Sequence, residues 1–485
     1  MKHNVQYSTD CTSRFTWRCA KNITFDASRT GKSLYDFFLS LPDYRCERKS
    51  NYSIAGMLTT LVVAMLLGYT STYQAVHWLG TAMGTEVIAQ LNIQFSRGRL
   101  PSYDTYSRML RCLNHEYFAM EFINWMNQVL LPVNIHLSID GKGLIGGTER
   151  VKGKRTPYAL NVVEATTGLT IASIPIQEKT NEITCIPEIL AWVAICSNMI
   201  TIDAIGTQTE IIKTIVEQHG DYLLLVKKNN PEAYNSLTSY FTECRQKQEA
   251  AAKATVNKSA SSEQSKVPND HPKIEEVQLC DWQLEKGHSR MEYRRCILVH
   301  ISSELENEDL ILATLGANSV LGSLEGCYRT IGMLECVRIP IERDEEGNDI
   351  TPSLQEFLKN GSRAKSAVKV GDDEDSDHYK VGIISSRFLS PEEAIQIKRD
   401  HWSVENKLHH VLDVSLREDM SSAKSAKWNL SLLRKVVINL ERLHILHGDA
   451  QDRHSMPCTG IDLGGDPCAL KKFLFGNLPL IRMDK

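Results

Sequence analysis

The sequence has no long apolar run and no secretory signal, which limits the kind of protein it can encode. The most apolar stretch, residues 55–67, is too short to span a bilayer and contains glycine and threonine, so it predicts a buried helix. The first ten residues lack the apolar core of a secretory signal. These absences predict a cytoplasmic protein without a membrane partner.

Paired cysteine motifs and an excess of one charge are missing as well. The 13 cysteines are odd in number and never form Cys-x-x-Cys, which argues against disulfides and a structural zinc site. The 55 Lys+Arg are balanced by 59 Asp+Glu, so the net charge of −4 offers no global attraction for nucleic acid. Any DNA binding must therefore come from local clusters of cations.

Apolar spacing divides the chain into helical and strand-like regions. Helical spacing from about residue 34 to 129 predicts a separate all-α region. After it, strand and helix patterns follow in the order β-β-β-α-β-α-β, with 158–165 and 169–177 forming a hairpin. This order predicts an α/β fold with a mixed sheet, and it is also the order of the ribonuclease-H-like fold.

Composition and apolar spacing change several times in the later part of the chain. Residues 246–272 are rich in Lys, Ser, Gln and Ala and are expected to form a mobile insertion, before strand patterns return at 282–301. Helical patterns then resume at 390–412 and 428–446. The expected organisation is an irregular segment (1–30), a helical domain (31–130), the first part of the core (131–240), a partly β insertion (241–385), core-completing helices (386–447) and a tail (448–485).

Two aspartates occupy positions suited to binding a metal ion. Asp140 ends a strand and precedes Gly-Lys-Gly, and Asp203 lies on an apolar strand that runs into a turn at Gly206. A carboxylate within an apolar strand is costly unless it is paired or bound to a metal, although a hydrogen-bonded structural role remains an alternative for each. Hard divalent cations prefer such oxygen ligands, and two of them can support phosphoryl transfer on DNA.

A third carboxylate must come from residues 401–419, where four acidic candidates occur. Val404, Leu408, Val411 and Leu412 define the buried side of a helix, and Glu405 falls at the edge of that side. Asp413 is expected on a flank, where Arg417 could pair with it. Glu418 and Asp419 are expected to face solvent near the helix end. Zinc binding by His401, His409 and His410 is disfavoured, because adjacent histidines on one helix give poor ligand geometry.

At these residues the chain resembles the H-repeat-associated insertion-sequence transposases, a DDE group of bacterial mobile elements. The resemblance runs in family order from about residue 35 to 445. It is carried by LPDYRCERKSNYSIAGML, LPSYDTYSRMLRCL, SIDGKGLIGG, TIDAIGTQTEIIKTIVEQHGDYLLLVKKNNP, EKGHSRMEYRR, HWSVENKLHHVLDVSLREDMS and WNLSLLRKVVINL.

The resemblance implies a ribonuclease-H-like core with an N-terminal all-α domain and a mostly β insertion. It implies that Asp140, Asp203 and Glu405 form the DDE triad and bind Mg²⁺ or Mn²⁺, as two ions. His401, Asn406 and Asp413 would support these ligands. The implied activity is binding of terminal inverted repeats, cleavage of the ends and joining of 3′-OH ends to target DNA, by a homodimer on double-stranded DNA in the bacterial nucleoid.

Cations near these motifs are candidates for DNA contacts, with ordinary surface charge as the alternative. They are Lys142, Lys152, Lys154 and Arg155 after the first aspartate, Arg290, Arg294 and Arg295 in EKGHSRMEYRR, and Arg108 and Arg111 in the helical domain. Two further readings of the function stay open. The chain could be a relict or domesticated DNA-binding protein without catalysis, or a nuclease on the same core.

Overall fold

The computed structural model describes residues 23–45, 50–95, 98–147, 156–176, 182–258, 277–287, 290–301, 315, 321, 327–360, 377–421, 423–448 and 456–483. Contacts divide the chain into two compact units. Unit 1 comprises Met1–Ile200 and Asp400–Lys485, and unit 2 comprises Thr201–Arg399. Both contain helices and strands, which confirms a mixed α/β architecture.

The N-terminal part of unit 1 is helical, as its apolar spacing predicts. Most of these helices start at a Ser, Thr or Asn whose side chain accepts the N–H three residues later, satisfying a donor that the first turn leaves unpaired. Every residue of α2 is buried, so the most apolar stretch of the chain is a core helix. The helices are α1 (Leu34–Leu39), α2 (Ile54–Leu66), α3 (Thr72–Leu79), α4 (Ala82–Gln90), α5 (Tyr103–Cys112) and α6 (His115–Val129).

Three antiparallel strands of unit 1 follow the helices. They are β2 (His136–Gly143), β3 (Tyr158–Glu164) and β4 (Thr170–Ile176), and β3 and β4 form the expected hairpin. Asp140 pairs in register with Asn161 of β3. Next come α7 (Glu182–Trp192) and β5 (Met199–Ile202), then α8 (Thr209–Glu217) and β6 (Asp221–Val226) in unit 2. The predicted β-β-β-α-β-α-β order along the chain is therefore confirmed.

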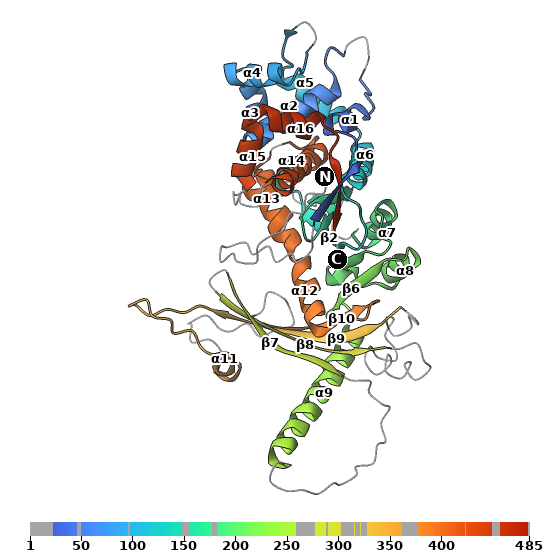
Figure 1. Cartoon of the computed structure of the whole chain (residues 1–485), viewed down its shortest axis with the longest axis vertical. Coiled ribbons are helices and arrows are strands. Elements are labelled where there is room, and N and C mark those ends of the chain that lie inside the picture. The colour runs from blue at the N-terminus through green and yellow to red at the C-terminus, as the bar shows by residue number, and fades with distance from the viewer. Residues whose placement is uncertain are drawn as a thin grey trace. The chain divides into compact units, whose positions relative to one another are not determined.

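Residues 23–30 and 456–483 form regular elements that the sequence analysis does not predict. Residues 23–30, expected to be irregular, form strand β1 (Ile23–Thr30), which pairs antiparallel with β11 (Pro479–Met483), as Figure 1 shows in blue and red. The unassigned tail also contains α15 (Met456–Gly465) and α16 (Pro467–Phe475). Leu463, Leu470 and Ile481 are buried, so residues 456–483 contribute to the core of unit 1.

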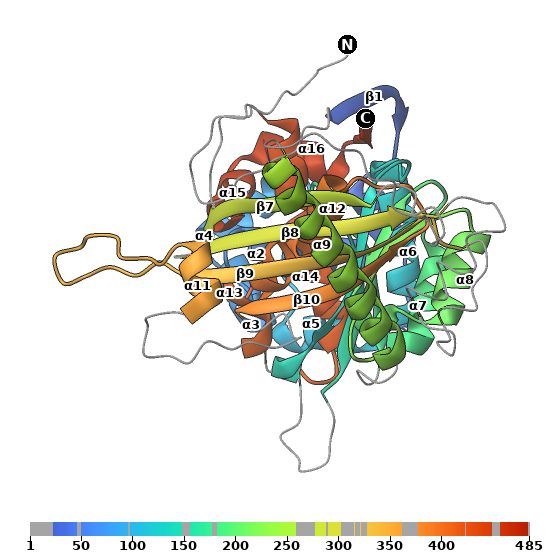
Figure 2. The same ribbon diagram turned by 90° about the horizontal axis from the view of Figure 1, so that it is seen from below.

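Unit 2 is built on an antiparallel sheet in the order β6-β10-β9-β8-β7. Helix α9 crosses one face of it, and contacts β9 and β10 (Figure 2). Residues 246–258, expected in a mobile insertion, are helical because α9 continues to Lys258, while 259–276 lie outside the described residues. The other elements are β7 (Gln278–Gly287), β8 (Arg290–His300), β9 (Thr330–Pro340), α9 (Pro231–Lys258), α11 (Leu354–Asn360) and β10 (His378–Ser385).

Helices resume after β10 as predicted. Helix α12 (Pro391–His401) crosses from unit 2 into unit 1. It is followed by a π-helical turn (Glu405–His409), α13 (His410–Val414) and the 3-10 turn η8 (Glu418–Met420). Helix α14 (Lys427–His447) is buried along most of its length.

Candidate metal centre

Asp140 lies in the second half of β2, where the buried strand reaches partial exposure. Leu137 and Ile139, which precede it on the strand, are apolar and buried and so anchor the backbone, while the Asp140 side chain is 30% exposed. One carboxylate oxygen, Oδ1, accepts the backbone N–H of Gly141 at 2.8 Å. The other oxygen, Oδ2, faces the π-helical turn of the same unit.

The π-helical turn holds Glu405 and His409 four residues apart. Apolar residues on its inner side are buried, as the helical spacing predicts, and Glu405 at the edge is half-exposed. Lys407 ties the turn to the β3–β4 connection by donating to the backbone carbonyls of Ala165 and Thr166. π-helical turns are rare and recur at functional sites because they re-aim side chains relative to an α-helix.

Asp140, Glu405 and His409 come together as one cluster. One ligand-capable atom from each lies within 4.8 Å of the other two. His409 Nδ1 donates to Glu405 Oε2 at 2.8 Å and lies 3.6 Å from Asp140 Oδ2. This hydrogen bond holds the pKa of the Glu405 carboxyl below its ordinary value, although partial burial opposes the shift. The cluster therefore offers two carboxylates and an imidazole, a donor set that suits a divalent cation.

His409 is the member of this cluster that sequence reasoning missed. The sequence disfavours a zinc site made of His401, His409 and His410, because two of these histidines are adjacent. The structure separates them, since His409 is buried and turned toward the carboxylates while His410 is exposed. The spacing of Glu405 and His409, four residues apart on one helix, is the signal that could have identified the pair.

Lys142 supports the cluster instead of facing solvent. Its side chain is 8% exposed, and the ammonium lies 2.8 Å from Asp413 and 3.9 Å from Asp419. Lys142 thus forms an ion pair that ties β2 to Asp413 of α13 and approaches Asp419 of η8, and its expected phosphate contact stays a prediction. Asp413 also pairs with Lys142 instead of the expected Arg417, because Arg417 lies past the helix end in a left-handed conformation.

The segment around Glu418 packs against the loop after β2. A side chain at Gly146 would lie 2.7 Å from the Glu418 carbonyl oxygen and 2.5 Å from that of Asp419, so the close approach requires glycine there. Glu418 itself is 3% exposed, which corrects its expected solvent-facing position. The guanidinium of Arg434 on α14 lies 3.9 Å from its carboxylate. Burial raises the pKa of the neighbouring Asp419 carboxyl.

Asp203 lies in unit 2, immediately after β5. Its carboxylate accepts the N–H of Ala204 at 2.7 Å, caps a short 3-10 turn and lies 3.5 Å from Lys227. The side chain is 55% exposed. The burial cost expected for an aspartate inside an apolar strand therefore does not apply, because the strand ends at Ile202.

The remaining predicted site residues occupy varied surroundings. His401, the last residue of α12, is half-buried, and Asn406, within the π-helical turn, is exposed. Arg108 and Arg111 are exposed on α5. In unit 2, Arg290 and Arg294 pair with Glu292, and Arg295 pairs with Glu335 at 2.8 Å. Lys152, Lys154 and Arg155 lie outside the described residues.

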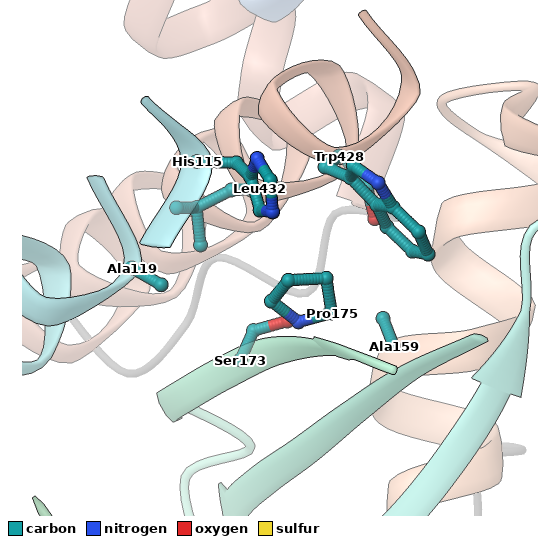
Figure 3. Close-up of a pocket in the computed structure, with 8 residues that line it drawn as sticks. His115, Ala119, Ala159, Ser173, Pro175, Trp428 and Leu432 are labelled. Atoms are coloured by element: carbon teal, nitrogen blue, oxygen red, sulfur yellow. The ribbon is translucent and has the colours of Figure 1, made fainter. Parts of the chain in front are cut away.

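Unit 1 also contains a small cavity away from this cluster. It is lined by His115 of α6, Trp428 and Leu432 of α14, and Pro175 of β4 (Figure 3). The rings of His115 and Trp428 stack with centroids 6.4 Å apart. The members of the metal-binding cluster do not line this cavity, so the cavity is a packing feature between α6, α14 and the β3–β4 hairpin.

Known proteins resemble the chain along most of its length. The DDE_Tnp_1-associated family model matches residues 35–126. The putative protein YbfL of Escherichia coli (strain K12) is 26% identical over 413 residues, which is 84% of this chain and 90% of that protein. The H repeat-associated putative transposase YhhI of that strain is also 26% identical over 413 residues, with coverages of 84% and 90%. The expected resemblance to the H-repeat-associated transposases is thus confirmed.

A solved structure gives a weaker likeness. The piggyBac transposase, in a synaptic complex with hairpin DNA, overlaps 91% of this chain and 77% of its own chain. The TM-score is 0.38 and the identity 10%. Within the described residues, none of the helices is both long and apolar enough to cross a membrane.

Proposed function

We propose that the chain is a DDE transposase of an insertion sequence. It would bind terminal inverted repeats, cleave the DNA ends and join the 3′-OH ends to target DNA. The observation that carries this proposal is the meeting of Asp140 and Glu405, which are far apart in sequence, within 4.8 Å in unit 1. The relatives named putative transposases support it, because they align with most of the chain.

A ribonuclease-H-like core is the proposed setting of the site. The order β2, β3, β4, α7, β5, α8, β6 supports it, since strands of this fold follow one another in that sequence. Asp203 is proposed as the third carboxylate of the DDE triad. The exposure of Asp203 at the end of β5 is compatible with that role.

The residues present fit divalent ions of the Mg²⁺ or Mn²⁺ type, of which we propose two. The carboxylates of Asp140 and Glu405 are partly exposed, and the lowered pKa of Glu405 keeps its carboxyl ionised at neutral pH. When bound, such ions neutralise charge at the phosphate and activate the attacking oxygen. The chain's own contribution is placement, because rigid ligands reduce the reorganisation needed during reaction.

Several side chains would perform this placement. His409 donates to Glu405 and fixes its carboxylate toward Asp140. Lys142 and the segment around Asp419 hold β2 against the helix that follows the π-helical turn. These contacts keep the two carboxylates together without a ligand.

DNA would be held by cations on other elements. Arg108 and Arg111 lie on α5, within the region matched by the DDE_Tnp_1-associated model. We propose that this helical region recognises the element's ends and that Arg290, Arg294 and Arg295 contribute contacts from unit 2. Since both ends of an element must be processed together, the DNA complex is proposed to contain a homodimer.

One assay tests the proposal. Full-length protein is incubated with DNA carrying the element's inverted repeats and a supercoiled target, in Mg²⁺ or in EDTA. Joined product in Mg²⁺ alone supports the transposase. Binding without cleavage would favour a relict DNA-binding protein, and cleavage without joining would favour a nuclease on the same core.

A further inference from the structure

The imidazole of His409 occupies a position that the DDE scheme does not explain. Its Nδ1 atom is 2.8 Å from Glu405 Oε2 and 3.6 Å from Asp140 Oδ2, so it faces both carboxylates at once. His409 is buried in unit 1, with 5% of the residue exposed. Its other nitrogen, Nε2, has no hydrogen-bond partner among the described residues. The polar contacts of this ring are therefore made by Nδ1, with the carboxylates of Glu405 and Asp140.

The spacing of these atoms matches the spacing of ligands around a single ion. Ions of this class bind their ligands at about 2.0–2.2 Å, so neighbouring ligand atoms lie roughly 3–4 Å apart. The distances from His409 Nδ1 to the two carboxylate oxygens, 2.8 Å and 3.6 Å, fall close to that range. A cation at this point would replace the proton by which Nδ1 now bonds to Glu405.

The backbone around His409 restricts the ring to this direction. Ser403 and Lys407 both donate to the carbonyl of Ala165, which ties the start of the π-helical turn to the β3–β4 connection. Leu408 on one side is fully buried, whereas His410 on the other is exposed. The wide π-helical turn therefore directs His409 toward the carboxylates and leaves His410 exposed.

We propose that His409 is a metal ligand alongside Asp140 and Glu405, and that it gives this site a preference for Mn²⁺ over Mg²⁺. This inference rests on the proposed function and deepens it by naming a nitrogen ligand and its consequence. Mg²⁺ demands oxygen ligands and retains its water, whereas transition-metal ions accept imidazole readily. Replacing one oxygen donor by nitrogen should therefore raise the Mn²⁺ affinity relative to that of Mg²⁺.

The test measures metal binding directly on the full-length protein without DNA. MnCl₂ and MgCl₂ are titrated by calorimetry, and pulsed electron paramagnetic resonance reads ¹⁴N coupling to bound Mn²⁺. The variants are His409→Gln, which keeps volume and polarity, His410→Gln as the matched exposed neighbour, and Asp140→Ala. Circular dichroism and thermal melting establish that each variant is folded.

The expected result is ¹⁴N coupling in the wild type that disappears in His409→Gln and persists in His410→Gln. His409→Gln should weaken Mn²⁺ binding at least about tenfold and Mg²⁺ binding much less, so the preference for Mn²⁺ is lost. Asp140→Ala should weaken the binding of both ions.

Two results would overturn the proposal. Wild-type protein that binds Mn²⁺ without ¹⁴N coupling would show that His409 only positions Glu405, even if His409→Gln weakens binding. Wild-type protein that binds no Mn²⁺ would remove the site altogether. The outcome is separable from the transposase assignment: joined DNA product without ¹⁴N coupling contradicts only the histidine ligand, and ¹⁴N coupling without DNA chemistry contradicts only the transposase.

Discussion

Two buried glutamates, one in each unit, show how partners decide the charge of a carboxyl group. Glu441 on α14 is 4% exposed and Glu335 on β9 is 3% exposed. Burial raises the pKa of Glu441 to about 8, despite the nearby Arg442 guanidinium. Burial also opposes ionisation of Glu335, but a hydrogen bond from His378 and the charges of neighbouring cations hold its pKa well below its ordinary value.

The difference lies in what each carboxylate touches. Glu335 is surrounded by donors from three directions, namely Arg245, Arg295 and His378. Glu441 Oε2 has no hydrogen-bond partner among the described residues. Equal burial therefore produces an ionised group in unit 2 and a neutral one in unit 1 at neutral pH. Glu405 represents a third case, in which partial exposure and a histidine keep the charge available for chemistry.

The largest effect is expected where the carboxylate is proposed to act on DNA. Asp140→Ala or Glu405→Gln should lower DNA cleavage by several orders of magnitude, because either change removes an oxygen ligand. DNA binding and thermal stability should survive, since both side chains are partly exposed. Glu116→Gln, an exposed change on α6, is the control. Cleavage at the wild-type rate by either variant would contradict the assignment of Asp140 and Glu405 as metal ligands.

The next largest effect should come from Glu335→Gln in unit 2. The change leaves the cations around Glu335 without their shared counter-ion, which should lower the free energy of unfolding by about 2–4 kcal/mol at pH 7. Urea denaturation with a probe in unit 2 measures it. The exposed ion pair between Glu210 and Lys213 on α8 provides the control. Glu210 is 81% exposed, so Glu210→Gln should lower the free energy of unfolding by at most about 0.5 kcal/mol. Equal losses from both variants would contradict the comparison.

The two glutamates should also give opposite pH dependences. For Glu441 the folded pKa of about 8 lies above the ordinary 4.5, so its stabilising contribution is complete below about pH 4.5 and is lost as pH rises through 8. Glu441→Gln should therefore be close to the wild type in stability at pH 5 and exceed it by up to about 5 kcal/mol at pH 9. Urea midpoints across this range provide the measurement.

Glu335 supplies the reverse case. Its folded pKa lies below the ordinary value, so its contribution is present above that value and is lost as the pH falls toward the folded pKa. The stability difference between wild type and Glu335→Gln should shrink under acid conditions. A difference that grows on acidification would show that the cations around Glu335 do not set its charge.

The smallest expected effect distinguishes exposed cations from paired ones. Arg108→Ala with Arg111→Ala should weaken binding to end DNA and reduce the salt dependence of the binding constant by about two charges. Arg294→Ala with Arg295→Ala should reduce it less, because those guanidiniums already pair with carboxylates. Binding isotherms at several salt concentrations decide this. Equal decreases in salt dependence for the two double variants would contradict the distinction between exposed and paired cations.

Much of the local structure could be predicted from sequence. The β3–β4 hairpin, the fully buried α2 and the strand that carries Asp140 all follow from apolar spacing and turn residues. Predictions failed where distant segments meet. Strand β1 was not recognisable because its pairing partner, β11, lies at the other end of the chain. Helix α9 continues through a polar, alanine-containing segment that composition alone indicated to be mobile.

The sequence by itself determined which residue types stand at strand ends and on helix faces, and so identified Asp140, Asp203 and Glu405 as candidates. Only tertiary structure decided their surroundings. The π-helical turn directs His409 and not His410 toward the carboxylates, and Lys142 turns inward to pair with Asp413. The physical reason is that the environment of a charged side chain depends on groups brought close by long-range packing, which neither periodicity nor spacing along the chain records.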